Sequence, residues 1–445
     1  MKRVRQRSAG DTTAIKFRRH TIRALAVLAA GIGVGYGLLL LVYLLPTAPM
    51  RAHLSASAAV LSGEREYHRV IPGVVSTQLD NYTDSWMMGN AVYDSPRSVW
   101  KRALACTSAD FGGGPLDGLV RYLGGEQGYR EVDYTRYWHG YLVLLKPFFL
   151  LFDYADLRVF NVLFQLLLVF LIFRSISKMG YEGEAWSYVL SILFMMPVVI
   201  PLSIQFSVIF YLTNISVLIL LKAYDWIADK NGMLLYFQLI GMCASYFDLL
   251  TYPLASLGVP LVCVLVIEAD RDSWTKVKNI ICLSVSWGFG YGAMWAGKWI
   301  LSTVVLRDSV IANALSQILL RASHTQNGAP ITVLDTWLRN VEFYFEKPFM
   351  ILTALCMAAF LAGILKSRSQ LADVCIDIIP FLLVAVMPFV WYALAGQHSY
   401  EHHWFTFRGL VVTVFACMCI CARLYRDTDT GYFQRGSRKR KGGVS

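Results

Sequence analysis

Charged residues are scarce in this sequence of 445 residues. Asp, Glu, Lys and Arg make up 16% of it, whereas 56% of the residues are hydrophobic. Soluble domains carry about 25% charged residues. Together with a mean hydropathy of +0.48, this composition excludes an ordinary soluble protein and predicts a polytopic membrane protein. The formal net charge of +11 lies largely in the two tails and in short loops, where it signals topology, so we expect no nucleic-acid partner.

The sequence also lacks a cysteine framework. Eight of the nine cysteines lie in or beside apolar stretches and Cys106 stands alone in a polar segment, which gives no sign of a disulfide scaffold. Cys417, Cys419 and Cys421 alternate along one apolar run and do not share a helical face, so we expect no metal site there. No required cofactor is predicted; a divalent cation is the one candidate, because paired carboxylates elsewhere could hold it.

Ten apolar runs are each close to the roughly 20 residues that a helix needs to cross the hydrocarbon core. A further run at 141–152 is interrupted by Lys146-Pro147. Counting it as a span would place most basic loops outside, against the positive-inside rule, so we interpret it as a re-entrant or interfacial helix. The predicted fold is therefore an all-α polytopic membrane protein with about ten transmembrane helices. These runs lie at 22–45, 158–176, 184–201, 204–222, 232–248, 252–268, 280–305, 348–366, 374–395 and 405–423.

The predicted organisation has a basic cytoplasmic tail at 1–21, one transmembrane bundle at 22–423 and a second basic cytoplasmic tail at 424–445. The short loops and the lack of a soluble appendage favour a bacterial plasma membrane. The bundle includes a long first extracytoplasmic loop, 47–157, which we expect to contain interfacial or re-entrant helices. Three further segments are predicted on the same side: 245–253, 307–347 and 396–405.

Two carboxylates in the first loop are the strongest candidates for chemistry. Asp80 and Asp84 lie four residues apart, a spacing that places both on one face of a helix. Paired carboxylates serve as general base, metal ligand or acid–base pair. The alternative is a solvated loop with a helix cap, because Asp is common at N-caps.

Three charged residues lie at or within apolar runs. Asp248 sits between two runs, Lys298 lies inside 280–305, and Arg408 lies one turn into the last run. Acids at membrane depth are costly and tend to be functional, and Arg and Lys suit a lipid phosphate. The alternatives are an interfacial turn for Asp248 and basic side chains that extend to the membrane surface for the other two.

The loop 396–405 contains His398, His402 and His403. His398 and His402 have the spacing of two metal ligands on a helix, but the segment has no HExxH pattern. Hydrogen bonds to a polar substrate or phosphate are the favoured role, and a structural interfacial role is the alternative. Arg136 and His139 begin the interrupted run and either anchor the membrane surface or contact an anionic headgroup.

This order of segments resembles the GT-C superfamily of integral-membrane glycosyltransferases: one span, a long loop with an acidic pair, interfacial helices, then a bundle with further loops on the same side. The resemblance implies transfer of a sugar from a polyprenyl-phosphate carrier to a glycan, lipid or protein acceptor on the extracytoplasmic face. It implies that Asp80, or Asp84, is the catalytic base and that Lys298, Arg408 and the 398–403 histidines lie near the donor phosphate. Family members usually have adjacent acids, whereas this chain has Asp-x-x-x-Asp.

Two other functions are compatible with the sequence. A transporter or flippase of lipid-linked saccharides would carry charged residues through the middle of its spans, where this chain has few apart from Asp377. A non-enzymatic membrane scaffold would not need acids, histidines and basic residues gathered on one side. The glycosyltransferase is the favoured prediction, with membrane lipids and a polyprenyl-phosphate sugar as its partners.

Overall fold

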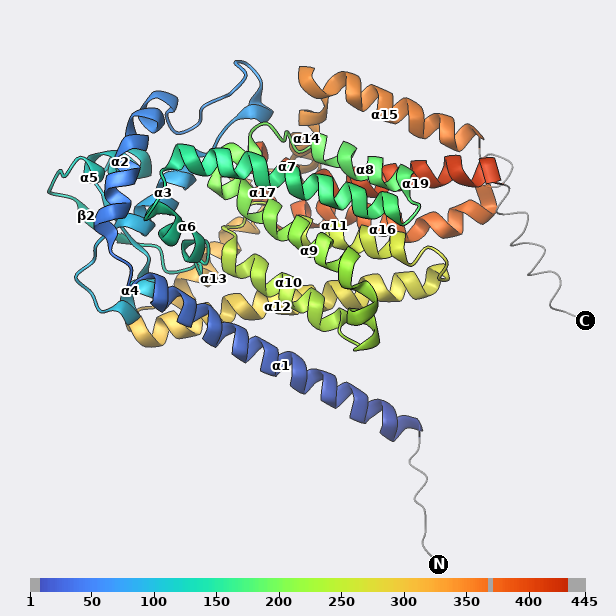
Figure 1. Ribbon diagram of the computed structural model, residues 1–445, viewed down its shortest axis with the longest axis horizontal. Helices are drawn as coiled ribbons and strands as arrows, with labels where there is room; N and C mark the ends of the chain where they lie inside the picture. The colour runs from blue at the N-terminus through green and yellow to red at the C-terminus, as the bar shows by residue number, and fades with distance from the viewer. Residues whose placement is uncertain (1–8, 367–370, 431–445) are drawn as a thin grey trace, which may run out of the picture.

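The computed structural model describes residues 9–366 and 371–430, and it is built almost entirely from helices (Figure 1). The basic residues at 1–8 and 431–445, which belong to the two predicted tails, lie outside the described residues. Strand is confined to two short antiparallel pairs in the part of the chain that the structure describes. The prediction of an all-α membrane protein is confirmed at this level.

Six helical segments among the described residues are long and apolar enough to cross a membrane. Their outer faces carry exposed apolar side chains such as Leu163, Phe164 and Leu355, as a lipid-facing surface requires. The six are Arg18–Val42 in α1 (Ala9–Val42), α7 (Tyr154–Lys178), α9 (Ile204–Asp229), α15 (Lys347–Lys366), Ile376–Leu394 in α16 (Leu371–Leu394), and His403–Arg426, which joins α18 (His403–Thr406), η5 (Phe407–Leu410) and most of α19 (Val411–Thr430).

The remaining four predicted spans lie in helices outside these six, so the count of ten stays a prediction. They are α8 (Glu182–Leu193), α10 (Met233–Phe247), α11 (Ala255–Ile267) and α12 (Ser273–Leu306). The run 184–201 is helical only to Leu193: Met196 adopts a left-handed φ of 57° and Pro197 follows, which ends the helix. A short 3₁₀ turn, η2 (Ile200–Leu202), then leads into α9.

The first loop contains short elements rather than a span. Helix α6 has eight residues, or about 12 Å, and cannot cross a core of about 30 Å; this agrees with the interpretation of 141–152 as an interfacial helix. The elements in order are α2 (Thr47–Glu64), η1 (Val75–Thr77), α3 (Asn81–Val92), α4 (Val99–Ala105), β1 (Thr107–Asp110), α5 (Pro115–Leu123), β2 (Arg130–Asp133) and α6 (Leu142–Phe149).

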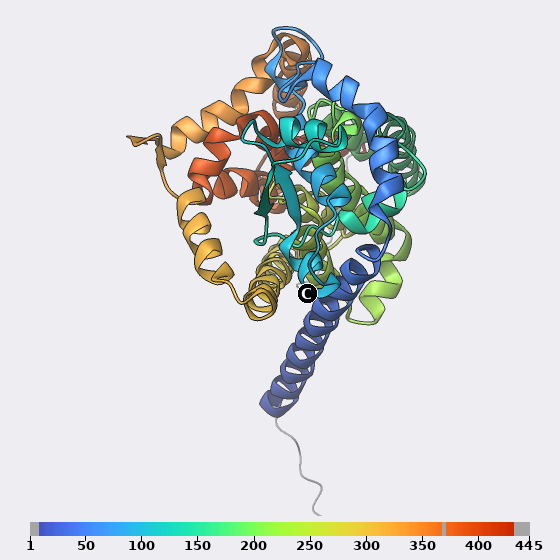
Figure 2. The same cartoon turned by 90° about the vertical axis from the view of Figure 1, so that its left-hand side faces the viewer.

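The polar segments gather at one end of the helical bundle. In Figure 1 this is the left end, whereas the described start of α1 and end of α19 lie to the right. Figure 2 looks onto that end and shows the first loop, in blue and teal, spread across it. The segment between α12 and α15 adds α13 (Val310–Arg321), β3 (Thr325–Gln326), β4 (Ala329–Pro330), α14 (Val333–Val341) and η3 (Glu342–Phe345), and α17 (Gly396–Glu401) follows α16. Which end faces the cytoplasm stays a prediction.

Helices α10 and α12 cross in direct backbone contact, and glycine makes this approach possible. A Cβ atom added at Gly290 would overlap the backbone carbonyl oxygen of Gln238, and one added at Gly241 would overlap that of Trp287. Small residues at such crossings allow close packing within membranes. The crossing holds α12 in place, and the C-terminal half of α12 lines one of the cavities described below.

We expect Gly290→Ala to destabilise the protein by about 1–3 kcal/mol, the usual cost of overpacking, because the new methyl group meets rigid backbone. Thermal unfolding of the purified protein in detergent would measure this. Gly288→Ala is the matched control on the same helix, since Gly288 is exposed and a Cβ there meets nothing; alanine should leave the midpoint unchanged or raise it. Equal midpoints for both variants would contradict the close-packed crossing.

Candidate functional site

A polar pocket of about 370 Å³ lies among the gathered loops. Each of the four segments predicted on one side of the membrane contributes to its lining: Asp80 from the first loop, Leu249 from 245–253, Arg321 from 307–347 and His398 from 396–405. Much of the remaining wall is aromatic and includes Tyr67, Tyr82, Trp86, Tyr134 and Trp404. The fold therefore brings residues far apart in sequence to one cavity that combines aromatic side chains with converging polar and charged groups, as ligand sites often do.

Asp80 is held at the pocket by the start of helix α3. It is the N-cap residue, and its Oδ1 accepts a hydrogen bond from the Thr83 N–H at 3.0 Å. Its side chain is 2% exposed. Burial raises the pKa of Asp80 to about 7, the neighbouring charge of Asp84 adds to the rise, and the hydrogen bonds from Thr83 oppose it. A carboxyl group that titrates near neutrality suits proton transfer.

Asp84 does not line the pocket, because its carboxylate is committed to a neighbouring helix. It accepts hydrogen bonds from the Tyr154 hydroxyl (2.6 Å) and from the N–H groups of Ile204 (2.8 Å) and Gln205 (3.0 Å). The last two are the first N–H groups of α9, so Asp84 caps α9 from α3 and meets its positive dipole end. Asp84 also accepts a hydrogen bond from the Ser203 hydroxyl at 3.1 Å. With four donors on its carboxylate, Asp84 has a structural role.

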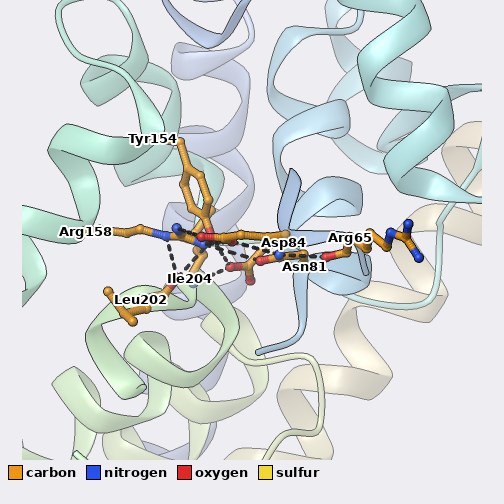
Figure 3. Close-up of polar contacts among 8 residues, drawn as sticks. Arg65, Asn81, Asp84, Tyr154, Arg158, Leu202 and Ile204 are labelled. Atoms are coloured by element: carbon orange, nitrogen blue, oxygen red, sulfur yellow. Dashed lines mark hydrogen bonds and ion pairs between the residues drawn. The ribbon is translucent and has the colours of Figure 1, made fainter. Parts of the chain in front are cut away.

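Arg158 of α7 adds further hydrogen bonds to the group around Asp84 (Figure 3). Its guanidinium donates two hydrogen bonds of 2.7 Å to Glu64 and one of 2.9 Å to the carbonyl of Leu202. Asn81 donates to Glu64 and to the Arg65 carbonyl. The network ties α2, α3, α7 and the start of α9 together, and it therefore fixes the position of Asp80 at the head of α3.

A second cavity of about 280 Å³ adjoins the polar pocket. It is lined by aromatic and aliphatic side chains of α12, α13 and α16, including Trp295, Trp299 and Trp391. Both cavities share Arg136, Tyr137 and Arg321 in their linings. We call these three residues the neck. An apolar compartment, two cations and a polar compartment thus follow one another.

The neck arginines are held by polar but mostly neutral partners. Arg136 donates to the Asn313 side-chain carbonyl at 3.0 Å and lies 5.1 Å from the Tyr134 ring centroid. Arg321 donates to His402 Nε2 at 2.9 Å, with Glu401 at 3.6 Å. Both cations border both cavities, which suits an anion between them.

His398 and His402 line the polar pocket, as one face of α17 and the turn after it, with ring centroids 4.9 Å apart. His398 Nε2 donates to the Leu250 carbonyl at 2.8 Å. His403 points elsewhere: it accepts from Arg339 at 3.1 Å and stacks on Phe343. The structure brings the first two histidines to Asp80 and leaves the third in the wall of the bundle.

Two other predicted cation sites are buried against backbone. Arg408 is fully buried and donates to the carbonyls of Met195, Trp404 and Ser76 at 3.1, 2.7 and 3.2 Å. Lys298 is fully buried and donates to the Leu104 carbonyl at 2.8 Å. Neither lines the polar pocket, so their described contacts fasten helices together.

Two further predicted residues lie behind the pocket walls. His139 is buried, with its ring nitrogens 2.7 Å from the Tyr141 hydroxyl and 2.6 Å from the Tyr134 carbonyl. Asp248 is buried and accepts from the Thr251 N–H at 2.9 Å. This turn supports Leu249 and Leu250, which line the polar and apolar cavities respectively. Both residues shape the walls without lining the polar pocket.

Sequence reasoning missed Arg321, Gln205 and the aromatic wall. Arg321 ends an amphipathic stretch, Val310–Arg321, whose apolar face and terminal cation were the available signals. Gln205 follows Pro201 and Ser203 at a helix start, and nothing in its local sequence indicates a cavity. A single glutamine or arginine in a loop is common, so only the fold distinguishes these two.

Among the described residues, no group of three or more His, Cys, Asp or Glu side chains is placed to hold a metal ion. Comparison of the chain with protein-family models, with curated proteins and with solved structures found no match. The geometry of the two cavities is therefore the main structural indication of function.

Proposed function

We propose that this protein is an integral-membrane glycosyltransferase that moves a sugar from a polyprenyl-phosphate carrier to an acceptor hydroxyl, with the polar pocket as its active site. The acceptor is a hydroxyl group of a glycan, a lipid or a protein, and the reaction takes place on the extracytoplasmic face of a bacterial plasma membrane. The resemblance of the segment order to the GT-C superfamily supports this proposal, and so does the arrangement of the two cavities.

One observation carries the proposal: an apolar cavity and a polar pocket share a neck that contains Arg136 and Arg321, and the polar pocket contains Asp80. A lipid-linked sugar has the same order of chemistry, with an apolar chain, an anionic phosphate and a hydroxylated ring. Ile318 lines the apolar cavity and is 42% exposed, and we expect this cavity to open toward the lipid phase. The start of the isoprenoid chain fits the apolar cavity.

In this arrangement Asp80 is the general base. The acceptor oxygen attacks the anomeric carbon as its proton passes to the Asp80 carboxylate, and the bond between the anomeric carbon and the phosphate oxygen breaks. The electron pair leaves with the polyprenyl phosphate. Arg136 and Arg321 stabilise the charge that develops on the departing phosphate, where fixed cations have their largest effect. The side chains of this chain supply each of these roles.

The pH profile of transfer is a direct consequence of this assignment. Below its pKa of about 7, the Asp80 carboxyl group is protonated and cannot accept the acceptor proton. We therefore expect kcat/KM to fall about tenfold per pH unit as the pH drops below 7 and to level off above it. Initial rates between pH 5 and pH 9 would show this limb. A rate that is flat across this range would contradict Asp80 as the base.

The function itself is tested with purified protein in lipid nanodiscs and a panel of radiolabelled polyprenyl-phosphate sugars. Release or transfer of the labelled sugar by the wild type is the expected result. Movement of intact lipid-linked saccharide across the membrane of proteoliposomes, without cleavage of any donor, would show that the protein is a flippase and not a transferase. If a folded sample neither binds nor turns over any donor, a non-enzymatic scaffold is the function that the result favours.

A further inference from the structure

Four side chains in the polar pocket keep a buried polar atom without a hydrogen-bond partner in the described structure: Gln205 Oε1, His398 Nδ1, His402 Nδ1 and Trp404 Nε1. Buried polar atoms are nearly always paired, and an unpaired one calls for an explanation. Gln205 is 4% exposed and His398 is 3% exposed. Four such residues in the lining of one cavity, which also contains Asp80, point to a ligand that completes their hydrogen bonds.

The hydrogen-bonding character of both imidazoles is fixed by their other nitrogen. His398 Nε2 contacts the Leu250 carbonyl, which only accepts, so this nitrogen carries the proton and Nδ1 of the neutral ring is an acceptor. His402 Nε2 contacts the guanidinium of Arg321, which only donates, so Nε2 accepts and Nδ1 carries the proton. Burial, with neighbouring positive charge, lowers the pKa of His402 to about 3 and that of His398 well below its usual value. The pair offers one acceptor and one donor.

Gln205 adds an amide with both capacities. Its backbone N–H donates a hydrogen bond to Asp84, which fixes the residue at the start of α9. Its side chain is then free of partners at Oε1 while it lines the pocket. A hydroxyl group both donates and accepts a hydrogen bond, and an amide or a donor–acceptor imidazole pair matches it.

The charges around the pocket disfavour an ionised ring. The two cations lie at the neck, where the proposed function places the phosphate. The carboxylates in the lining are Asp80 and Asp133, which would repel a uronate. An ammonium group beside Asp80 would form an ion pair with the base and hold it away from the acceptor proton. The free hydrogen-bonding groups are neutral, and the aromatic walls suit the apolar faces of a sugar ring.

We propose that the transferred ring is a neutral polyhydroxy sugar and that Gln205, His398 and His402 determine this specificity by pairing with its hydroxyl groups. This inference rests on the proposed function for its placement of the phosphate. It names the substrate class and adds Gln205, on a different element from the histidines, as a specificity-determining residue.

The test compares three free glycosides and their lipid-linked forms on the full chain in nanodiscs. The probes are methyl glucoside, methyl glucuronide and methyl 2-amino-2-deoxyglucoside, and undecaprenyl phosphate carrying the same three sugars. The neutral glycoside is expected to bind at least about 10-fold more tightly than the glucuronide. The neutral lipid-linked sugar is expected to be transferred at least about 10-fold faster than the amino sugar, whose ammonium group would hold Asp80 in an ion pair. Gln205→Ala should weaken binding of the neutral probe about 10-fold, the usual effect of leaving polar partners unpaired.

Two further variants keep the test interpretable. Gln205→Glu retains the shape of the side chain and should lose at least as much affinity for the neutral glycoside, even where alanine lowers the yield of folded protein. Gln127→Ala is the matched control, because Gln127 is exposed and, among the described contacts, its side chain donates only to the Gly125 carbonyl; this variant should bind as the wild type does. Unfolding midpoints of all variants separate specificity from folding.

The outcomes separate the inference from the proposed function. Equal or tighter binding of the glucuronide overturns the inference, as does equal or faster transfer of the amino sugar. Wild-type preference in both Gln205 variants also overturns it, even if lipid-linked donors are cleaved. Selective binding of the neutral glycoside, with its loss in the Gln205 variants, supports the inference. If no lipid-linked donor is cleaved in that case, the transferase fails while the neutral-sugar site stands.

Discussion

Replacement of Asp80 by asparagine is expected to lower kcat for sugar transfer by about 10²–10⁴-fold, the usual contribution of a general base. Asparagine keeps the size of the side chain and an oxygen that accepts the Thr83 N–H at the start of α3. The fold and the donor affinity should therefore change little, and the loss should appear in kcat rather than in KM. The acidic limb of the pH profile should disappear in the residual activity.

The controls for this variant use other aspartates of the same loop. Asp117→Asn changes an exposed carboxylate on α5 that pairs with Arg121 and should leave the rate unchanged. Asp84→Asn removes one acceptor from the four-donor anchor of α9 and should lower the unfolding midpoint. An Asp80→Asn protein that turns over within twofold of the wild type would falsify the base assignment.

The overall fold was largely predictable because apolar runs of span length are a strong signal. Six of the predicted spans have counterparts that satisfy both length and apolarity. The run 184–201 was not predictable in detail: its composition is apolar throughout, and only Pro197 signals the break that follows Leu193. That the run 141–152 forms no full-length span was predictable from charge, since the positive-inside rule made a span there costly.

The candidate site was predictable in part, and the groups that each buried side chain contacts explain the difference. Asp80, Arg136, His398 and His402 line one pocket, as expected of polar residues grouped on one side. Asp84, Lys298 and Arg408 are equally conspicuous in the sequence, but they donate to or accept from backbone groups inside the bundle. A charged residue in an apolar run gives the same sequence pattern whether its side chain lines a cavity or bonds to a backbone carbonyl. Only three-dimensional contacts distinguish the two cases.

The neck provides the second large effect. Arg321→Ala is expected to lower kcat/KM for a lipid-linked donor by about 10–100-fold, because a charge-assisted hydrogen bond to phosphate is lost in both the ground state and the transition state. Arg321→Lys should recover part of this loss, since lysine keeps the charge but not the planar two-pronged geometry. Steady-state kinetics with a labelled donor would measure both. Arg130→Ala is the matched control, because Arg130 is exposed and pairs only with Asp110 among the described contacts.

A comparison of probes shows whether Arg321 acts on phosphate or merely supports the pocket. Arg321 also donates to His402, so its loss could disturb the sugar-binding groups as well as the neck. If its main role is phosphate binding, Arg321→Ala should lower the affinity for a lipid-linked sugar at least about 10-fold and the affinity for a free methyl glycoside by less than about threefold. An equal loss of affinity for both probes would show that Arg321 acts by supporting His402. It would contradict the placement of the phosphate at the neck. Unequal weakening would instead support the order of apolar chain, phosphate and sugar along the two cavities, because only a ligand with a phosphate at the neck would respond to the cation there.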